Sequence, residues 1–100
     1  MADLPVGHHR VEVDALVAGP GAIYHGGVLR TSGDESSVIV YDGIDSSAID
    51  VIDFFHGQEN GGDHHWLGEG ITVRRGLYVA LGVRVADFTI YLKPPPRATV

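Results

Sequence analysis

Val38-Ile39-Val40-Tyr41-Asp42-Gly43 is the stretch that decides the fold class of this chain. Three β-branched residues followed by a tyrosine are typical of a β-strand, and an Asp-Gly pair is typical of the turn that ends one. Because consecutive positions are apolar, both faces of this strand must be covered, which predicts a central place in its sheet. A second strand is predicted over 77–81, where Leu, Val and Leu alternate with Tyr and Ala after a glycine.

The same period-two pattern recurs on either side of this stretch. Apolar residues alternate with polar or small ones over 11–17 and 88–92, and the glycine pair inside segment 22–29 predicts a bulge or bend. Segment 49–56 fits either a short helix or a strand with a bulge, and its β-branched and aromatic residues favour the strand. Seven or eight strands at a spacing of about 8–12 residues predict an all-β, antiparallel β-sandwich, with jelly-roll connections among the topologies it allows.

The chain is expected to form one domain with an extended arm at each end. Residues 1–10 show no periodicity and are predicted to be an N-terminal arm, followed by the β-sandwich over 11–93. Residues 94–100 begin with three prolines, which cannot donate to a sheet ladder, so an extended C-terminal tail is predicted. Within the sandwich, residues 57–65 are predicted to be a polar loop.

The charge balance argues against an anionic partner. Seven Lys and Arg residues stand against thirteen Asp and Glu, so with a net charge of -6 neither nucleic acid nor an anionic membrane is expected as a partner. The chain has no cysteine, and no apolar run approaches the ~20 residues of a membrane-spanning helix. Residues 1–5 lack the basic and apolar regions of a signal peptide, so synthesis in the cytoplasm is expected.

The histidines could supply a metal site. Imidazole and carboxylate groups bind zinc, iron or nickel, and the weak candidate ligands are His56, His64 and His65. In an extended segment, however, adjacent residues such as His64 and His65 point to opposite faces, and the His-x-His spacing of metal sites on strands is missing. A polar, partly exposed loop is therefore the preferred interpretation, and no metal or other cofactor is expected.

No residue pattern predicts catalysis. Ser36, Ser37, Ser46 and Ser47 adjoin turns, where serine side chains bond to the local backbone, and there is no Gly-x-Ser-x-Gly elbow. Carboxylates paired at turns and strand edges are normally solvated, and no glycine-rich turn leads into a helix to bind phosphate. The chain is therefore expected not to be an enzyme.

The aromatic residues support further interpretations. Trp66 and the tyrosines within strands could stack on sugar rings, which would make the chain a small carbohydrate-binding β-sandwich. Alternatively, these side chains cover the rim of a small core with their polar ends exposed, or they anchor a protein interface, where Tyr and Trp are favoured.

Four segments carry a resemblance to a known class of proteins. They are the glycine-rich bend and strand of 19–29, the strand ending Tyr-Asp-Gly at 38–43, the Ile-x-Val-x-x-Gly-Leu-Tyr-Val run within 71–81, and the last strand, 88–92. In this order they resemble small structural proteins of tailed bacteriophages, in particular the decoration (cement) proteins that sit on phage heads as β-rich trimers. The resemblance implies a virion subunit that binds the major capsid protein on the outer surface of the head. Residues 56–65 and 94–96 lie outside the pattern, so a tail or head–tail component is the alternative.

The contacts expected of such a subunit are with the capsid and with copies of itself. Self-association as a trimer or a dimer would bury surplus apolar strand faces. The residues expected at these interfaces are Leu4, Val6, His8, His9, Tyr41, Trp66, Tyr78, Pro94 and Pro95.

Overall fold

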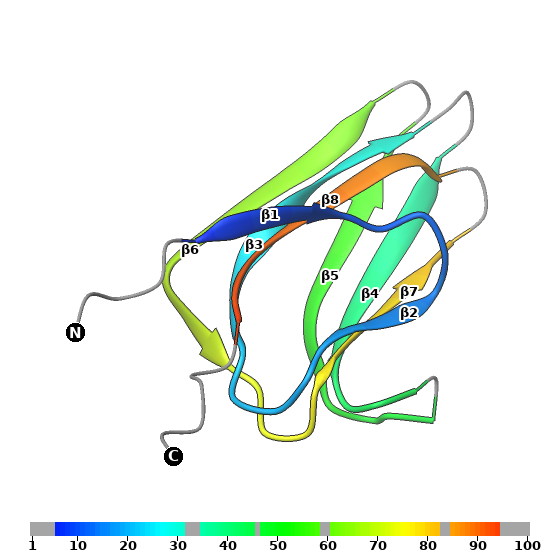
Figure 1. Ribbon diagram of the computed structural model, residues 1–100. Coiled ribbons are helices and arrows are strands. Elements are labelled where there is room, and N and C mark those ends of the chain that lie inside the picture. The colour runs from blue at the N-terminus through cyan, green and yellow to red at the C-terminus, as the bar shows by residue number, and fades with distance from the viewer. Residues whose placement is uncertain (1–5, 32–34, 46, 59–60, 83–84, 95–100) are drawn as a thin grey trace, which may run out of the picture.

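The computed structural model describes residues 6–31, 35–45, 47–58, 61–82 and 85–94. Within these ranges the chain forms eight strands and no helix (Figure 1). The strands are β1 (Gly7–Arg10), β2 (Ala15–Ala18), β3 (Ile23–Thr31), β4 (Ser36–Asp42), β5 (Val51–Gly57), β6 (Gly62–Thr72), β7 (Leu77–Leu81) and β8 (Val85–Lys93). The predicted all-β fold class is confirmed.

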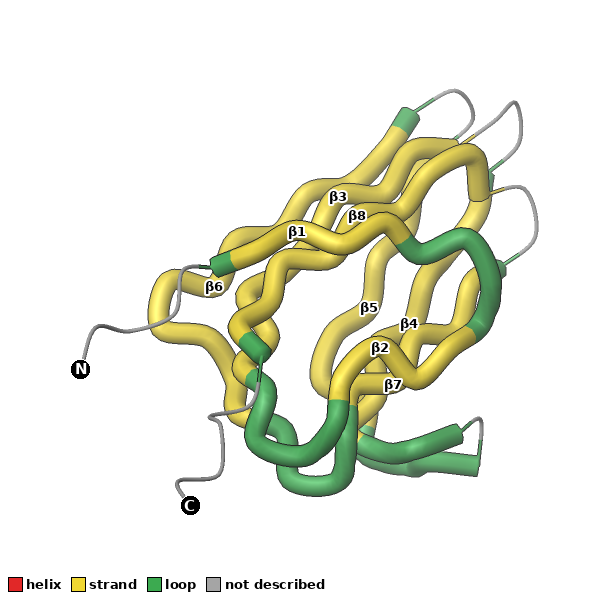
Figure 2. The backbone as a smooth tube through the Cα atoms, in the orientation of Figure 1, coloured by secondary structure: helices red, strands yellow, loops and turns green. Residues whose placement is uncertain are grey.

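Two antiparallel four-stranded sheets pack face to face (Figure 2). Sheet A has the strand order β1-β8-β3-β6, and sheet B has the order β2-β7-β4-β5. Along the chain in both directions from the β4–β5 connection, the strands pair in turn as β4–β5, β3–β6, β2–β7 and β1–β8. The chain is thus one long hairpin whose successive strand pairs alternate between the sheets, which is the eight-stranded jelly-roll arrangement.

The core lies between the sheets and is built from side chains at alternate strand positions. On β4, Val38 and Val40 point inward and are fully buried. Phe55 of sheet B meets Phe88 of sheet A edge-on, with ring centroids 5.0 Å apart. Burial of each such side chain contributes about 1.5–3 kcal/mol, so these contacts hold the two sheets together. The other buried apolar residues are Val11, Ala22, Tyr24, Leu29, Val73, Leu77, Val79 and Ile90.

Hydrogen bonds hold the corner at which the hairpin passes between the sheets. The β2–β3 and β6–β7 connections lie side by side there, and the backbone N–H of Gly21 donates to the carbonyl of Val73 at 2.9 Å. The carboxylate of Asp42, at the end of β4, accepts the backbone N–H groups of Arg74 at 3.0 Å and Arg75 at 2.9 Å. The Asp-Gly turn predicted after this strand therefore also binds a second turn.

An irregularity divides the pairing of β3 with β6 into two parts. Tyr24 pairs with Ile71, but Gly26 pairs with Trp66, so the intervening residues of β6 stand out of regular register. Gly26 has a φ of 114°, and a Cβ at this position would overlap the carbonyl oxygen of His65. The bulge predicted at the glycine pair is confirmed, and the two backbones approach as closely as only glycine permits.

The strand interpretation of residues 49–56 is also confirmed. Val51–Gly57 forms β5 on β4, and the register shifts between Val40 and Tyr41, which is the expected bulge. The large apolar residues at Val51 and Phe54 are about half exposed because β5 is an edge strand with an outward face.

Three predicted boundaries differ from the structure. Within the expected N-terminal arm, Gly7–Arg10 pairs with β8 as strand β1. The strand expected over 11–17 begins only at Ala15, because the preceding residues cross between the sheets. The expected polar loop 57–65 becomes strand at Gly62, where β6 pairs with β3. In each case the backbone hydrogen bonds are made with a partner strand that is distant in the sequence. The composition of the segment itself therefore does not indicate where the strand begins.

Candidate functional site

Sheet A presents aromatic and imidazole side chains on its outer face. His8, Tyr91 and Trp66 lie on the same side, since His8 pairs with Tyr91 and both Tyr91 and Trp66 pair with Gly26. His64 shares that side because it lies two residues before Trp66 on β6. His8, His64, Trp66 and Tyr91 are called the aromatic face below.

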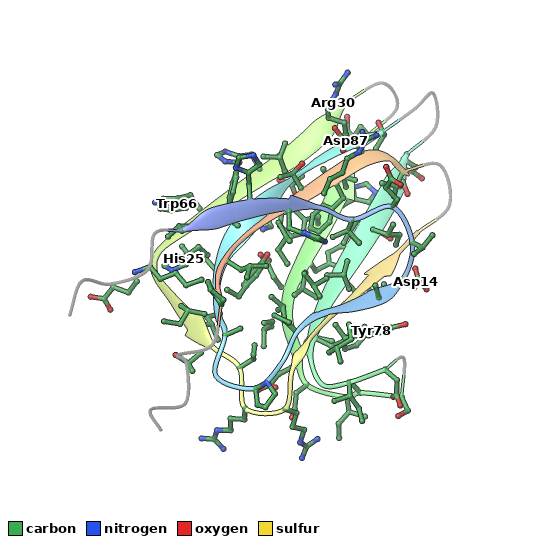
Figure 3. All side chains as sticks on the ribbon, viewed as in Figure 1. Asp14, His25, Arg30, Trp66, Tyr78 and Asp87 are labelled. Atoms are coloured by element: carbon green, nitrogen blue, oxygen red, sulfur yellow. The ribbon has the colours of Figure 1, made fainter. Side chains whose placement is uncertain are left out.

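Trp66 is an exposed side chain at the edge strand β6 of the aromatic face (Figure 3). Its ring makes a T-shaped contact with Tyr91 at 5.9 Å, and Tyr91 makes another with His64 at 6.2 Å. Because Gly26 lies between Trp66 and Tyr91 and has no side chain, the two rings can meet above it. Trp66 remains 55% exposed, so a rigid aromatic surface faces outward.

His25 supports the indole of Trp66. The two rings stack with centroids 5.5 Å apart and planes 23° apart, and His25 itself is only 3% exposed. Its Nδ1 lies 3.0 Å from the carbonyl oxygen of Leu67, which makes this nitrogen the donor. Within the described residues its Nε2 is buried without a hydrogen-bond partner. The buried ring thus fixes one side of an indole that is otherwise solvent-facing.

A second group of polar side chains lies where the edge strands β5 and β6 of the two sheets approach each other. The imidazole of His65 lies between two carboxylates, with Nδ1 2.9 Å from Oδ1 of Asp53 and Nε2 3.2 Å from Oδ2 of Asp63. The same ring stacks on Phe55, with centroids 4.2 Å apart. The hydroxyl of Tyr24 donates to Oδ2 of Asp53 at 2.6 Å. These five residues are called the edge cluster.

The edge cluster places one imidazole between two carboxylates. A carboxylate oxygen only accepts, so Nδ1 of His65 donates the hydrogen bond to Asp53. Burial raises the pKa of the Tyr24 phenol, and the hydrogen bond to Asp53 and the charge of that carboxylate raise it further. The phenol therefore stays neutral and acts as a donor. These contacts between side chains of β3, β5 and β6 are suited to holding the two sheets together.

The three histidines predicted as weak metal ligands lie on three different surfaces. His64 points outward on sheet A, and His65 points inward in the edge cluster. His56 is exposed on β5 of sheet B, where its Nε2 lies 3.5 Å from Glu35. In the part of the chain that the structure describes, no group of three His, Cys, Asp or Glu side chains is arranged to hold a metal.

The outer face of sheet B carries two rows of paired apolar residues, beside the polar pair of Ser37 and His56. One row crosses all four strands and consists of Leu16, Tyr78, Tyr41 and Val51, and the next crosses three strands and consists of Ala80, Ile39 and Phe54. These seven residues are called the apolar face. Figure 3 shows Trp66 and Tyr78 on opposite sides of the sandwich, so the aromatic face and the apolar face point away from each other.

Four of the predicted interface residues lie on these two faces, Tyr41 and Tyr78 on sheet B and His8 and Trp66 on sheet A. Sequence reasoning missed Tyr91 and most of the apolar face. The available signal was the unbroken apolar run 38–41, which requires cover on both faces of β4.

The remaining predicted interface residues are more dispersed. His9 pairs with the buried Ile90, so it lies on the inner side of the sheet at the exposed edge strand β1. Val6 is half-buried and Pro94 is exposed. Leu4 and Pro95 lie outside the described residues.

The open hollows in the described part of the molecule include two with volumes of about 220 and 240 Å³. The first lies beside Arg10 and Asp87, whose Nε and Oδ1 atoms are 3.1 Å apart. The second lies beside Ser37 and His56. Neither is lined by a residue of the aromatic face or the apolar face.

No family model matches the chain, and no curated protein or solved structure matches it. Among the described residues there is no helix with the length and hydrophobicity needed to span a membrane. Function is therefore inferred from the two outer faces and the edge cluster.

Proposed function

We propose that this chain is a non-enzymatic structural subunit of a tailed-phage virion, namely a decoration protein that binds the outer surface of the head. The observation that carries the proposal is that Trp66 on one sheet face, and Leu16, Val51 and Phe54 on the other, are exposed and line neither of the two hollows. Small-molecule sites are usually concave, whereas exposed apolar patches mark surfaces that bind other proteins.

The jelly-roll topology supports the same role without deciding it. Viral capsid domains use this arrangement of strands, and so do lectins and cupins. Since one fold hosts many functions, the choice rests on the surfaces that the fold displays. The four-segment resemblance to phage structural proteins lies within the described jelly roll, from 19–29 to 88–92.

The aromatic face is the surface that we assign to the major capsid protein. Trp66 and Tyr91 are rigid and amphipathic, and such side chains are frequent anchors of protein interfaces. The adjoining edge strands β1 and β6 of sheet A also present backbone groups that could pair with a strand of the capsid protein. Many copies on one shell would add weak single contacts into firm attachment.

The proposal is tested on heads of the encoding phage assembled without this chain. Purified protein is mixed with these heads and sedimented, and wild-type protein is expected to sediment with them. Trp66→Ser is expected to bind at least ~10-fold more weakly, since truncation of an anchor costs about 2 kcal/mol or more. Val13→Ser is the matched control, because Val13 is 69% exposed and belongs to neither face.

Two results would contradict the decoration role. Wild-type protein that stays in the supernatant has no head contact. Electron cryomicroscopy of complete virions that places the chain in the tail would establish the tail or head–tail alternative instead.

A carbohydrate-binding module is the second candidate, and the exposed Trp66 beside Tyr91 favours it. The π-face of an indole is suited to pack against the apolar side of a sugar ring. A glycan array probed with wild-type protein and with Trp66→Ser decides between the candidates. A hit that needs Trp66, combined with no binding to heads, would favour this second role.

A further inference from the structure

The apolar face of sheet B is unusual for a sandwich, in which outward residues are normally polar. Leu16, Val51 and Phe54 are 49%, 53% and 51% exposed. Tyr41 and Tyr78 lie between them, with ring centroids 6.3 Å apart, and both are half-buried. A continuous apolar surface therefore spans the sheet from one edge strand to the other.

His56 follows Phe54 on the outward side of β5, with its Nε2 3.5 Å from Glu35. Other charged residues lie around the two apolar rows. Asp14 immediately precedes β2, Glu35 precedes β4, and Asp50 precedes β5. Arg75 lies just before β7, with Nη1 4.0 Å from Oδ2 of Asp50. Because neighbouring strands are antiparallel, these groups are divided between the two ends of the sheet. An apolar centre with a charged rim is the usual composition of a protein interface.

The size of the face sets the strength of the contact. Four strands about 4.8 Å apart and about six residues long, at ~3.3 Å per residue, give roughly 400 Å². A standard interface buries about 800 Å² on each partner, so a contact limited to this sheet falls in the weak class. Ile44 and Ile49, 62% and 84% exposed, lie in the β4–β5 connection at one end of the sheet.

We infer that the apolar face binds the same face of a second copy, as a two-fold symmetric dimer. The two rows of the apolar face carry no charged side chain, so they offer nothing to recognise a charged partner, whereas a second copy presents the same two apolar rows. Identical patches meeting across a two-fold axis are the commonest oligomer contact. The two copies would stack sheet B on sheet B about 10 Å apart, as sheets in sandwiches do.

The rim is consistent with this choice. Each copy carries a net charge of -6, so contact through a charged surface would bring like charges together. Stacking through the apolar face leaves the rim carboxylates at the solvated border, where salt screens them. The inference deepens the proposed structural role by naming its self-contact, and it rests on that proposal for its biological setting.

Sedimentation velocity of the full chain over a range of concentrations tests the inference. Wild-type protein is expected to pass from monomer to dimer with a dissociation constant of roughly 1–100 μM. Phe54→Asp and, at the opposite edge of the face, Leu16→Asp are each expected to raise this constant at least ~10-fold, because a charge would be buried without a partner. Trp66→Ser, on the opposite sheet, is the matched control and is expected to leave it unchanged.

A measurement on the wild-type chain avoids any folding defect of the variants. The ring proton resonances of Tyr41 and Tyr78 are expected to shift with protein concentration, whereas the indole resonance of Trp66 is expected to stay constant. Wild-type protein that remains a monomer at millimolar concentration, forms a trimer, or shifts only the Trp66 resonance would overturn the dimer. Head binding by a strictly monomeric protein would overturn this inference alone, and a dimer that ignores heads would overturn the decoration role alone.

Discussion

His65 on β6 and Asp53 on β5 join the two sheets of the jelly roll through one hydrogen bond, with Nδ1 and Oδ1 2.9 Å apart. The side chain of Asp53 is only 14% exposed, and its carboxylate also accepts the Tyr24 hydroxyl and the backbone N–H of Phe54. A core phenol, an edge imidazole and a backbone amide thus converge on one carboxylate.

Replacement of His65 by Gln should therefore weaken the contact between the sheets. We expect the free energy of unfolding to fall by about 1–3 kcal/mol, because the partly buried Asp53 would lose the hydrogen bond from the imidazole. Urea unfolding followed by circular dichroism measures this loss. His64→Gln is the matched control, since His64 points outward, and a cost equal to that of His65→Gln would contradict the role of this hydrogen bond.

Replacement of Tyr24 by Phe removes a buried donor and keeps the ring. We expect a cost of about 1–2 kcal/mol, and a double variant with His65→Gln should deviate from additivity because both residues share Asp53. Tyr91→Phe, on the aromatic face, is the control. Additive costs within error would show that the two residues act independently.

Tyr24 should also limit stability in alkali. Burial, together with the hydrogen bond to Asp53 and its charge, raises the pKa of Tyr24 in the folded chain. This stabilising contribution is complete below the unfolded pKa of about 10 and is lost above it, where only the unfolded chain ionises. The slope should approach ~1.4 kcal/mol per pH unit in wild type and flatten in Tyr24→Phe. Equal slopes in urea titrations of both proteins would refute this assignment.

Asp42 should contribute stability that is lost in acid. Although desolvation raises its pKa, the backbone N–H groups of residues 74–76 outweigh this effect and, with the charge of Arg75, lower it. The contribution is present above the unfolded pKa of about 3.9 and disappears as the pH falls through the folded value. Asp42→Asn should therefore be less stable than wild type at neutral pH and nearly equal to it in strong acid. Asp50→Asn, an exposed control, should show little difference at either pH.

Gly26→Ala should damage the fold severely. The position has a φ of 114°, and the new Cβ would meet the backbone carbonyl of His65. The unfavourable backbone conformation alone costs about 1–3 kcal/mol, and the overlap adds to it. Gly68→Ala is the control, because nothing lies within 4 Å of a Cβ built there. Thermal unfolding compares the two, and similar transition temperatures would show that β3 and β6 can separate without cost.

Some parts of the fold could be predicted because their causes are local. The central strand at Val38–Tyr41 follows from an unbroken apolar run, and the bulge at Gly26 follows from a glycine pair inside a strand pattern. Residues 62–65 could not be recognised as strand, because Gly62, Asp63 and the two histidines have weak strand propensity of their own. Their pairing with β3 supplies the hydrogen bonds that outweigh it.

The candidate surfaces show the same division. Trp66, Tyr41 and Tyr78 could be proposed as interface residues from their type, and this stays a prediction, but their distribution over two opposite faces depends on strand register. The edge cluster was not predictable as a unit. Its residues come from β3, β5 and β6, and Asp53 and His65 meet only because edge strands of different sheets lie together.

By itself the sequence determined an all-β chain of short strands, a central strand at 38–41 and an acidic surface, because period-two alternation, turn residues and net charge are local or summed properties. Only the tertiary structure decided which strands pair, which side of each strand is outward, and therefore that His64 and His65 serve different surfaces. Pairing and register depend on contacts between residues far apart in the chain, and a shift of one residue would reverse every side chain.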